Sequence, residues 1–179
     1  MTVGEVVDVI SNQQRELEPA NARDLEAVVQ LLSKGRLPVA DVESHINVFT
    51  LARWNGIVVG TAGLEKFGEL ALLRSLCVAE HHRSKRIGRA LVSGVVSSAL
   101  AQGARELFLL TINAAPYFEK LGFVAIERDQ APPEIRNTAQ FGALCPTSAV
   151  CMRKTIGRSL EAPASPTDAG GAGQPGRSG

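Results

Sequence analysis

The stretch from Leu70 to Val92 limits what this chain can fold into more than any other segment does. An apolar run typical of a β-strand ends at Val78-Ala79, a strongly basic loop follows over 81–86, and a helix begins at Ile87-Gly88. The first N–H groups of a helix have no intrahelical partner, and the helix dipole adds positive potential at that end. The segment therefore predicts an anion site whose ligand is a phosphate or pyrophosphate.

The positive charge of this loop is local, because the formal net charge of the 179 residues is only +1. Nucleic-acid binders spread Lys and Arg over one face or use aromatic platforms, and only 4% of these residues are aromatic, so we expect no nucleic-acid partner. No apolar run has the length of a membrane span, and the N-terminus lacks the pattern of a signal peptide. Cys77, Cys145 and Cys151 have no zinc-like spacing, which favours a reduced cytoplasmic protein without a metal site.

The folded part of the chain is expected to be one α/β domain over residues 15–157. From residue 161 onward the sequence is rich in Pro, Gly, Ala and Ser and has no large apolar side chain. Such a segment buries too little surface to offset the entropy of ordering it. We therefore predict a disordered tail over 158–179, and we interpret residues 1–14 as a loosely ordered leader.

Turn and cap residues divide the domain into alternating elements. Asn21 and Asp24 predict the start of a helix that ends at Gly35, and Asn55-Gly56 and Phe67-Gly68-Glu69 predict two hairpins. A short turn or helix is expected near 39–45, strands at 48–53, 57–65, 70–79, 107–110, 123–127 and 149–155, and further helices at 87–102 and 115–121. In the helix over 87–102, the apolar spacing predicts burial of Ile87, Leu91, Val92, Val95, Val96 and Leu100. The order indicates an antiparallel meander followed by a parallel β-α-β step.

Two motifs on these elements carry a family resemblance. The first is L-C-V-A-E-H-H-R-S-K-R-I-G at 76–88, and the second is T-I-N-A-A-P-Y-F-E-K-L-G-F at 111–123. With the meander before them, they make most of residues 15–157 resemble the GNAT family of acetyl-CoA-dependent N-acetyltransferases. The resemblance implies a mixed, mostly antiparallel sheet flanked by helices, with acetyl-CoA as cosubstrate and a small-molecule amine as acceptor.

A narrower resemblance rests on the ending L-C-P-T-S-A-V-C-M at 144–152, together with segments 63–65, 71–76 and 109–111. These look like the small acetyltransferases encoded beside arsenic-resistance genes, which implies detoxifying N-acetylation of an amino-acid-like compound. Two other functions stay open: a CoA-sensing binding module without turnover, and acetylation of protein N-termini or lysines. A homodimer, common among relatives, also stays open.

The resemblance assigns the cosubstrate to the end of the third meander strand, the basic loop and the second motif. A backbone N–H near Leu76–Val78 is expected to polarise the thioester carbonyl. The residues expected to bind acetyl-CoA are Leu76, Cys77, Val78, Arg83, Ser84, Lys85, Arg86, Ile87, Gly88, Arg89, Thr111, Ala114 and Phe118. Arg86 replaces the first loop glycine of the family, and it is costly there if the position needs a positive φ. Its guanidinium would also add charge to the phosphate site.

The catalytic candidates are Glu65 as the base and Tyr117 as the acid. Phe118 stands where many relatives have the tyrosine thought to protonate the departing thiolate, and the neighbouring Tyr117 points about 100° away on a helix. Arg74 interrupts an apolar strand, so it either pairs with Glu65 or grips an acceptor carboxylate. Ser75, His45 and Arg136 are further acceptor-side candidates. Cys77 looks like a strand residue rather than a nucleophile, which indicates direct transfer.

Overall fold

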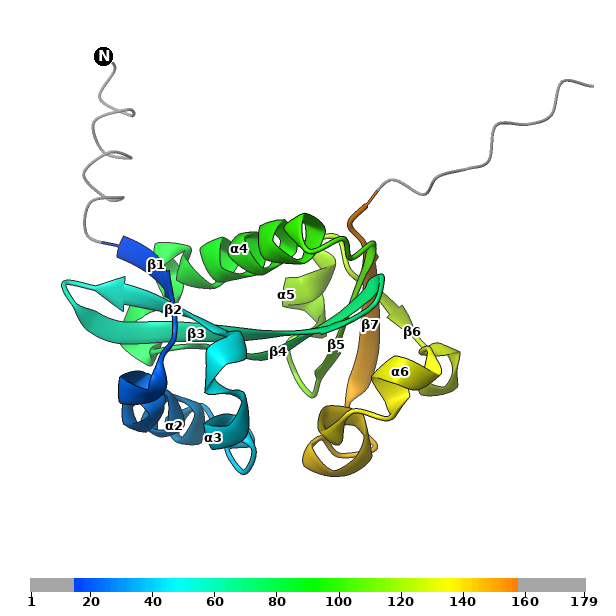
Figure 1. Ribbon diagram of the computed structural model, residues 1–179, viewed down its shortest axis with the longest axis horizontal. Coiled ribbons are helices and arrows are strands. Elements are labelled where there is room, and N and C mark those ends of the chain that lie inside the picture. Colours follow the sequence, from blue (N-terminus) through cyan, green and yellow to red (C-terminus); the bar gives the residue numbers. More distant parts are fainter. Residues whose placement is uncertain (1–14, 158–179) are drawn as a thin grey trace, which may run out of the picture.

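The computed structural model describes residues 15–157, and within that range the strands form one seven-stranded sheet with helices on both faces (Figure 1). The predicted leader over 1–14 and the predicted tail over 158–179 lie outside the described residues. In space the strand order is β1-β2-β3-β4-β5-β7-β6. The strands are β1 (Arg15–Pro19), β2 (Phe49–Trp54), β3 (Ile57–Phe67), β4 (Leu70–Val78), β5 (Glu106–Thr111), β6 (Val124–Ile126) and β7 (Val150–Thr155).

Both predicted hairpins are confirmed, and the backbone explains their residues. Asn55 and Gly56 have φ of 50° and 79° and join β2 to β3 as a two-residue turn, which is the geometry that Asn-Gly favours. Gly68, with φ of 61°, turns β3 into β4. The antiparallel meander β2-β3-β4 follows directly from these turns.

The helices on the two faces begin and end where local chemistry places them. The Asn21–Asp24 capping box opens a 3-10 turn (Ala22–Asp24) that continues into α2 (Leu25–Lys34), and Gly35 is the C-cap. Two short elements, α3 (Val42–His45) and a 3-10 turn (Ile46–Val48), lead into β2. In Figure 1, α2 and α3 lie below the sheet and α4 (Ile87–Ala101) lies above it.

Helix α4 buries most of the predicted apolar face. Ile87, Leu91 and Val95 are fully buried against the sheet, and Ala99 continues this row at the same four-residue interval. The predicted burial of Leu100 is wrong, because the buried row runs through Ala99 and leaves Leu100 42% exposed on the flank of the helix. No helix among the described residues is long and apolar enough to cross a membrane.

The parallel β-α-β step is confirmed, and the end of the sheet holds a feature that the sequence did not indicate. Helix α4 carries the chain from β4 to β5, which is covered on both faces, and α5 (Ala115–Glu119) follows. Strand β7 then inserts between β5 and β6 instead of following β6 at the edge. The connection from β6 to β7 holds a 3-10 turn (Arg128–Gln130), α6 (Pro133–Arg136) and a π-helical turn (Gln140–Leu144), which pack on Leu72 and Phe108.

Candidate active site

A cleft opens where β4 and β5 part from each other. The two strands pair in parallel only from Leu70–Leu72 to Glu106–Phe108, although β4 continues to Val78 and β5 to Thr111. Between the separated ends lies a cavity of about 1160 Å³, whose walls include residues 73–78 of β4 and 109–114 after the pairing ends. Beyond Leu72, the edge of β4 that faces away from β3 has no β5 partner, so main-chain groups on this edge are available to a molecule in the cleft.

A β-bulge in β4 lies on the wall of this cleft. Thr61 pairs with Cys77 and Gly63 with Arg74, so β4 contains one more residue than β3 between these two pairs. Ser75, inside the bulge, has a φ of 53°. Bulges of this kind bend a strand and redirect its main-chain groups.

The basic loop forms one end of the cleft. It folds as a 3-10 turn (Glu80–Lys85), and α4 begins directly after it with no side chain capping its first N–H groups. Arg83, Ser84, Arg86, Gly88 and Arg89 line the cleft at this end. Two predicted cosubstrate residues direct their side chains elsewhere: the Lys85 ammonium lies 4.1 Å from the centre of the Trp54 ring, and the Ile87 side chain is fully buried in the core. A cosubstrate contact of either residue would come from its main chain.

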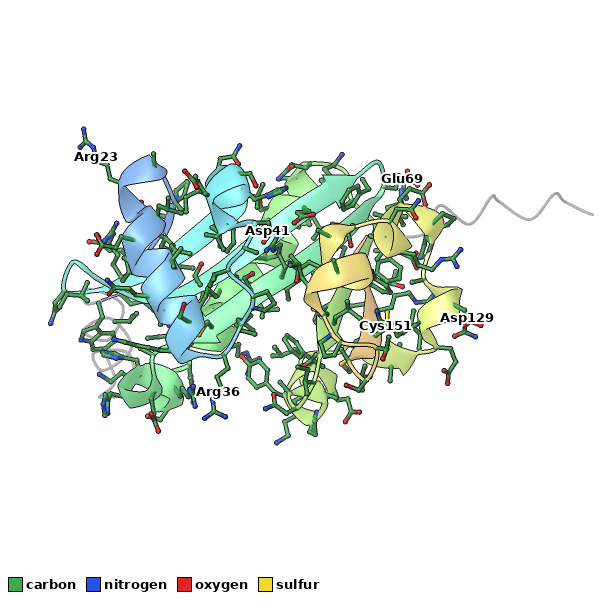
Figure 2. All side chains as sticks on the ribbon, turned by 90° about the horizontal axis from the view of Figure 1, so that it is seen from below. Arg23, Arg36, Asp41, Glu69, Asp129 and Cys151 are labelled. Atoms are coloured by element: carbon green, nitrogen blue, oxygen red, sulfur yellow. The ribbon has the colours of Figure 1, made fainter. Side chains whose placement is uncertain are left out.

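Arg86 occupies the left-handed conformation that a glycine would favour, with φ of 57° and ψ of 15°. A non-glycine residue in this region is strained. Arg86 is nevertheless exposed and lines the cleft, where it adds positive charge. Arg36, at the end of α2, has the same φ of 57° and also lines the cleft. Figure 2 shows Arg36 projecting away from the end of α2.

Tyr117 and Phe118 lie at the same end of the cleft as the basic loop. Phe118 is buried, and its ring packs edge-on against Tyr117 and Phe123. A Cβ placed on Gly88 would lie 2.8 Å from the Tyr117 hydroxyl oxygen, so this hydroxyl lies against the first turn of α4. Burial raises the pKa of Tyr117, and the nearby Arg89 partly opposes that rise. Thr111 Oγ1 accepts a hydrogen bond of 3.1 Å from Ala114 N–H and fixes the turn before α5.

A buried ion cluster lies behind the other end of the cleft. Only 1% of the Arg74 side chain is exposed, and its Nη1 donates to Glu65 Oε1 at 2.7 Å. Asp41 accepts from both terminal nitrogens of Arg74, each at 2.6 Å, in a bidentate pair. Of the two predicted alternatives for Arg74, pairing with Glu65 or binding an acceptor carboxylate, the structure shows pairing with Glu65. The bidentate and therefore stronger partner is Asp41, which lies 33 residues away in sequence.

The charges of this cluster stabilise one another. Burial alone lowers the pKa of the Arg74 guanidinium, but its hydrogen bonds to Asp41 and Glu65 outweigh burial and raise the pKa. The hydrogen bonds from Arg74 hold the pKa of Asp41 below its usual 3.8. Arg74 Nε also lies 3.3 Å from Ser75 Oγ, so little of the guanidinium is left to hold an acceptor carboxylate.

Five predicted residues are not brought into the lining of the cleft: His45, Glu65, Lys85, Ile87 and Arg136. His45 is partly exposed, and its Nδ1 lies 2.9 Å from the Asp41 carbonyl oxygen. Arg136 is exposed on α6. Of the described residues that do line the cleft, none is an aspartate, a glutamate or a histidine, whereas Arg36 and Lys120 add positive charge that the sequence did not indicate.

Cys77 and Cys151 fit the interpretation that they are buried strand residues rather than nucleophiles. Cys77 is buried, its thiol donates to the Leu31 carbonyl at 3.5 Å, and burial raises its pKa. Burial also raises the pKa of Cys151 to about 11. A thiol with a raised pKa is a poor nucleophile, so neither side chain is prepared for covalent catalysis.

Comparison with known proteins shows which family the central part of the chain resembles. Residues 45–125, which span the meander, the basic loop and the second motif, match the family described as Acetyltransferase (GNAT) domain. This region of the chain is similar to a GNAT acetyltransferase domain. An uncharacterized N-acetyltransferase of Chlorobaculum tepidum is 35% identical to it over 98 residues, which are 54% of this chain and 63% of that protein.

Other similar proteins have amino acids or acetylated amino acids in their names. The amino-acid acetyltransferase of Aeromonas salmonicida is 35% identical over 95 residues, or 52% of this chain and 22% of that protein. The chain thus spans less than two thirds of both relatives. The N-acetylglutamate synthase of Neisseria gonorrhoeae, solved with coenzyme A and N-acetyl-glutamate, superposes with a TM-score of 0.70 at 20% identity over 80% of this chain and 35% of that chain. This likeness confirms the GNAT fold.

Proposed function

We propose that the protein is an acetyl-CoA-dependent N-acetyltransferase that transfers the acetyl group directly to the amine of a small molecule. One observation carries the proposal: the cleft between β4 and β5 ends at the uncapped N-terminus of α4, where Arg83, Arg86 and Arg89 gather. Helix N–H groups and arginines are the donors that a pyrophosphate needs. The cleft then leads from this anion site along the unpaired edge of β4.

The chain's own groups fit this cosubstrate. Unpaired N–H groups of β4 near Leu76–Val78 would bind the arm of acetyl-CoA that contains its amide groups. They would also stabilise negative charge on the thioester oxygen. The acceptor nitrogen attacks the carbonyl carbon, the C–S bond breaks, and the thiolate leaves with the electron pair. The Tyr117 hydroxyl lies against the first turn of α4, which supports a phosphate contact, and its role as acid stays a proposal.

The acceptor amine must lose a proton, and we propose Glu65 as the group that takes it through water. The lining of the cleft, within the described residues, has no carboxylate of its own. Glu65 is 14% exposed and bound to Arg74, which fixes its position behind the cleft wall. The proton therefore travels by at least one water in this account.

We propose an amino-acid-like acceptor, since relatives are named amino-acid acetyltransferases and the cleft is lined by cationic side chains. The narrower link to arsenical detoxification rests on the ending at 144–152. Location in the cytoplasm fits the three free cysteines of the described residues. His45, Ser75 and Arg136 remain acceptor-side proposals, with Ser75 alone of the three on the lining.

The test is a thiol-release assay with acetyl-CoA and a panel of amines. The panel contains amino acids, phosphorus- and arsenic-containing analogues, and short peptides with free N-termini or lysines. We expect acceptor-dependent release of free CoA with the amino-acid-like compounds. Release with peptides alone would favour protein acetylation, and no release at high enzyme concentration would contradict the proposed activity.

A second candidate, a CoA-binding module without turnover, is favoured by Phe118 and by a cleft lining without a carboxylate. Phenylalanine cannot return a proton to the thiolate. Calorimetry separates the two functions, because a binding module takes up acetyl-CoA and releases no thiol with any member of the panel.

A further inference from the structure

Asp41 is an N-cap residue that does not cap its helix. Aspartate at this position normally accepts a hydrogen bond from the second or third N–H of the helix. Here no side-chain cap bond forms at the start of α3, and both carboxylate oxygens of Asp41 turn to Arg74 instead. The main-chain carbonyl of Asp41 serves α3, since it accepts from Ser44 Oγ at 3.0 Å and lies 2.9 Å from His45 Nδ1. The nearer carboxylate oxygen of Asp41 is 3.9 Å from the same His45 nitrogen.

Arg74 immediately precedes the bulge in β4. Its Nε lies 3.3 Å from Ser75 Oγ, and Ser75 is the bulge residue with a φ of 53°. Gly63 lies opposite on β3, where an added Cβ would come within 3.0 Å of Arg74 Cγ. The guanidinium also lies over the Phe49 ring at 5.7 Å. Arg74 is thus enclosed by β2, β3 and the α2–α3 connection.

The bidentate pair joins two walls of the cleft. Gly35–Pro38, at the start of the α2–α3 connection, line the cleft on one side, and Asp41 ends that connection. Residues 73–78 of β4 line it on another side. In Figure 2, Asp41 lies near the middle of this face, between α2 and the segment before β7. Arg74 and residues 144–146 line the same cleft.

We propose that Asp41 is a positioning residue. Through Arg74 it holds the β4 bulge and the α2–α3 connection in one arrangement, so that the N–H groups after the bulge face the cleft. It touches neither acetyl-CoA nor the acceptor in this account. The proposal deepens the proposed N-acetyltransferase function and rests on it for its kinetic test.

The first test measures hydrogen exchange on the full chain without any ligand. Asp41→Asn replaces one acceptor oxygen with an amide NH2 group, which cannot accept from Arg74. We expect faster exchange in peptides covering 36–48 and 74–78 than in the unaltered protein. Glu69→Gln is the matched control, because it removes the exposed Arg105–Glu69 pair at the other end of β4. Unchanged exchange at 74–78 in Asp41→Asn would overturn the proposal.

The kinetic test uses acetyl-CoA and the best acceptor from the amine panel. Asp41→Asn should lower kcat by about 10- to 100-fold, since small misplacements of reacting groups cost that much. The KM for acetyl-CoA should change by less than about 2-fold, because the anion site at α4 is untouched. Asp41→Glu retains the carboxylate and should recover part of kcat. An unchanged kcat in Asp41→Asn would contradict the proposal. The Asp41→Asn variant also takes the place of any other substitution at Asp41 that fails to fold.

A comparison of acceptors separates positioning from direct binding. If Arg74 acts through the bulge, Arg74→Lys should lower kcat equally for an amino acid and for its carboxamide. A loss confined to the carboxylate-bearing acceptor would show that Arg74 binds the acceptor and would overturn the proposal. If the unaltered protein acetylates nothing in the panel, the proposed function fails, and hydrogen exchange alone decides whether Asp41 holds the bulge.

Discussion

The two ends of the cleft use arginine in opposite ways. At the α4 end, Arg83, Arg86 and Arg89 are exposed and stand beside uncapped helix N–H groups. At the other end, Arg74 is buried and gives most of its donors to Asp41 and Glu65. The first arrangement leaves charge free for a ligand, whereas the second uses its charge inside the protein.

This difference indicates how strongly ligand binding or stability in each region should depend on a single side chain. An exposed anion site shares its ligand among several donors, so one substitution weakens binding and leaves the fold intact. A buried ion cluster loses its balance when one member is removed, because the remaining charges stay in an environment of low polarity. Substitutions should therefore affect binding at the α4 end and stability at the Arg74 end.

The largest effect is expected from Arg74→Ala, which leaves Asp41 and Glu65 without their shared cation. We expect the free energy of unfolding to fall by about 3–5 kcal/mol, as for other broken buried pairs. Urea denaturation measures it. Arg153→Ala is the control, because the Arg153–Glu106 pair is 45% and 29% exposed and should be worth less than about 1 kcal/mol. Equal losses in the two variants would remove the distinction between the ends.

Gly88→Val should affect binding instead. A Cβ at this position meets the Tyr117 hydroxyl at 2.8 Å and fills the space beside the first N–H groups of α4. The KM for acetyl-CoA should rise by about 10- to 100-fold, the equivalent of one or more lost hydrogen bonds to a charged group.

Gly94→Ala provides the control in the same helix, since its Cβ would meet only Leu17 at 3.6 Å. It should leave the KM unchanged and stabilise α4 by about 0.5–1 kcal/mol. If Gly88→Val binds acetyl-CoA as well as Gly94→Ala does, the anion site does not lie at the N-terminus of α4.

Arg86→Gly should change stability and binding in opposite directions. Glycine relieves the left-handed strain and should raise the free energy of unfolding by about 1 kcal/mol. Loss of the guanidinium should raise the KM for acetyl-CoA by about 3-fold, the value of a modest exposed contact. Thermal unfolding and steady-state kinetics on the same preparation test both signs. A variant that binds acetyl-CoA more tightly would show that Arg86 obstructs the ligand.

The smallest effect is expected in acid. The folded-state pKa of Asp41 lies below 3.8, so its ion pair contributes full stability above pH 3.8 and loses it as the pH falls through the lowered pKa. The stability difference between the unaltered protein and Asp41→Asn should therefore be constant near neutral pH and shrink below pH 3.8. Urea denaturation at several pH values measures it, and a difference that grows in acid would contradict the pairing.

The sequence predicted what depends on neighbours along the chain. Asn55-Gly56 predicted the first hairpin because both residues tolerate positive φ, and the structure confirms it. The basic loop predicted an anion site because helix N-termini have the same chemistry in any fold, and that site stays a prediction. The sequence also indicated that Arg86 would be costly if its position needed a positive φ, and the structure gives it a φ of 57°. These features need no knowledge of tertiary contacts.

Other features depend on contacts between distant segments. Asp41 pairs with Arg74 across 33 residues, and no local pattern distinguishes it from an ordinary helix cap. The insertion of β7 between β5 and β6 depends on which strand edges remain free after the meander forms. Arg36 follows the predicted helix stop at Gly35, but its place on the cleft is set by how α2 packs on the sheet. The roles of Glu65 and Tyr117 stay predictions.

The most direct measurement of the central claim is hydrogen exchange of the full chain with and without acetyl-CoA. If acetyl-CoA binds in the cleft between β4 and β5, we expect it to slow amide exchange in residues 86–90, where α4 begins, and in residues 75–78, on the unpaired edge of β4. Exchange at the β3–β4 turn around Gly68 should not change. Binding of acetyl-CoA without protection at either segment, or protection confined to another part of the molecule, would contradict the account.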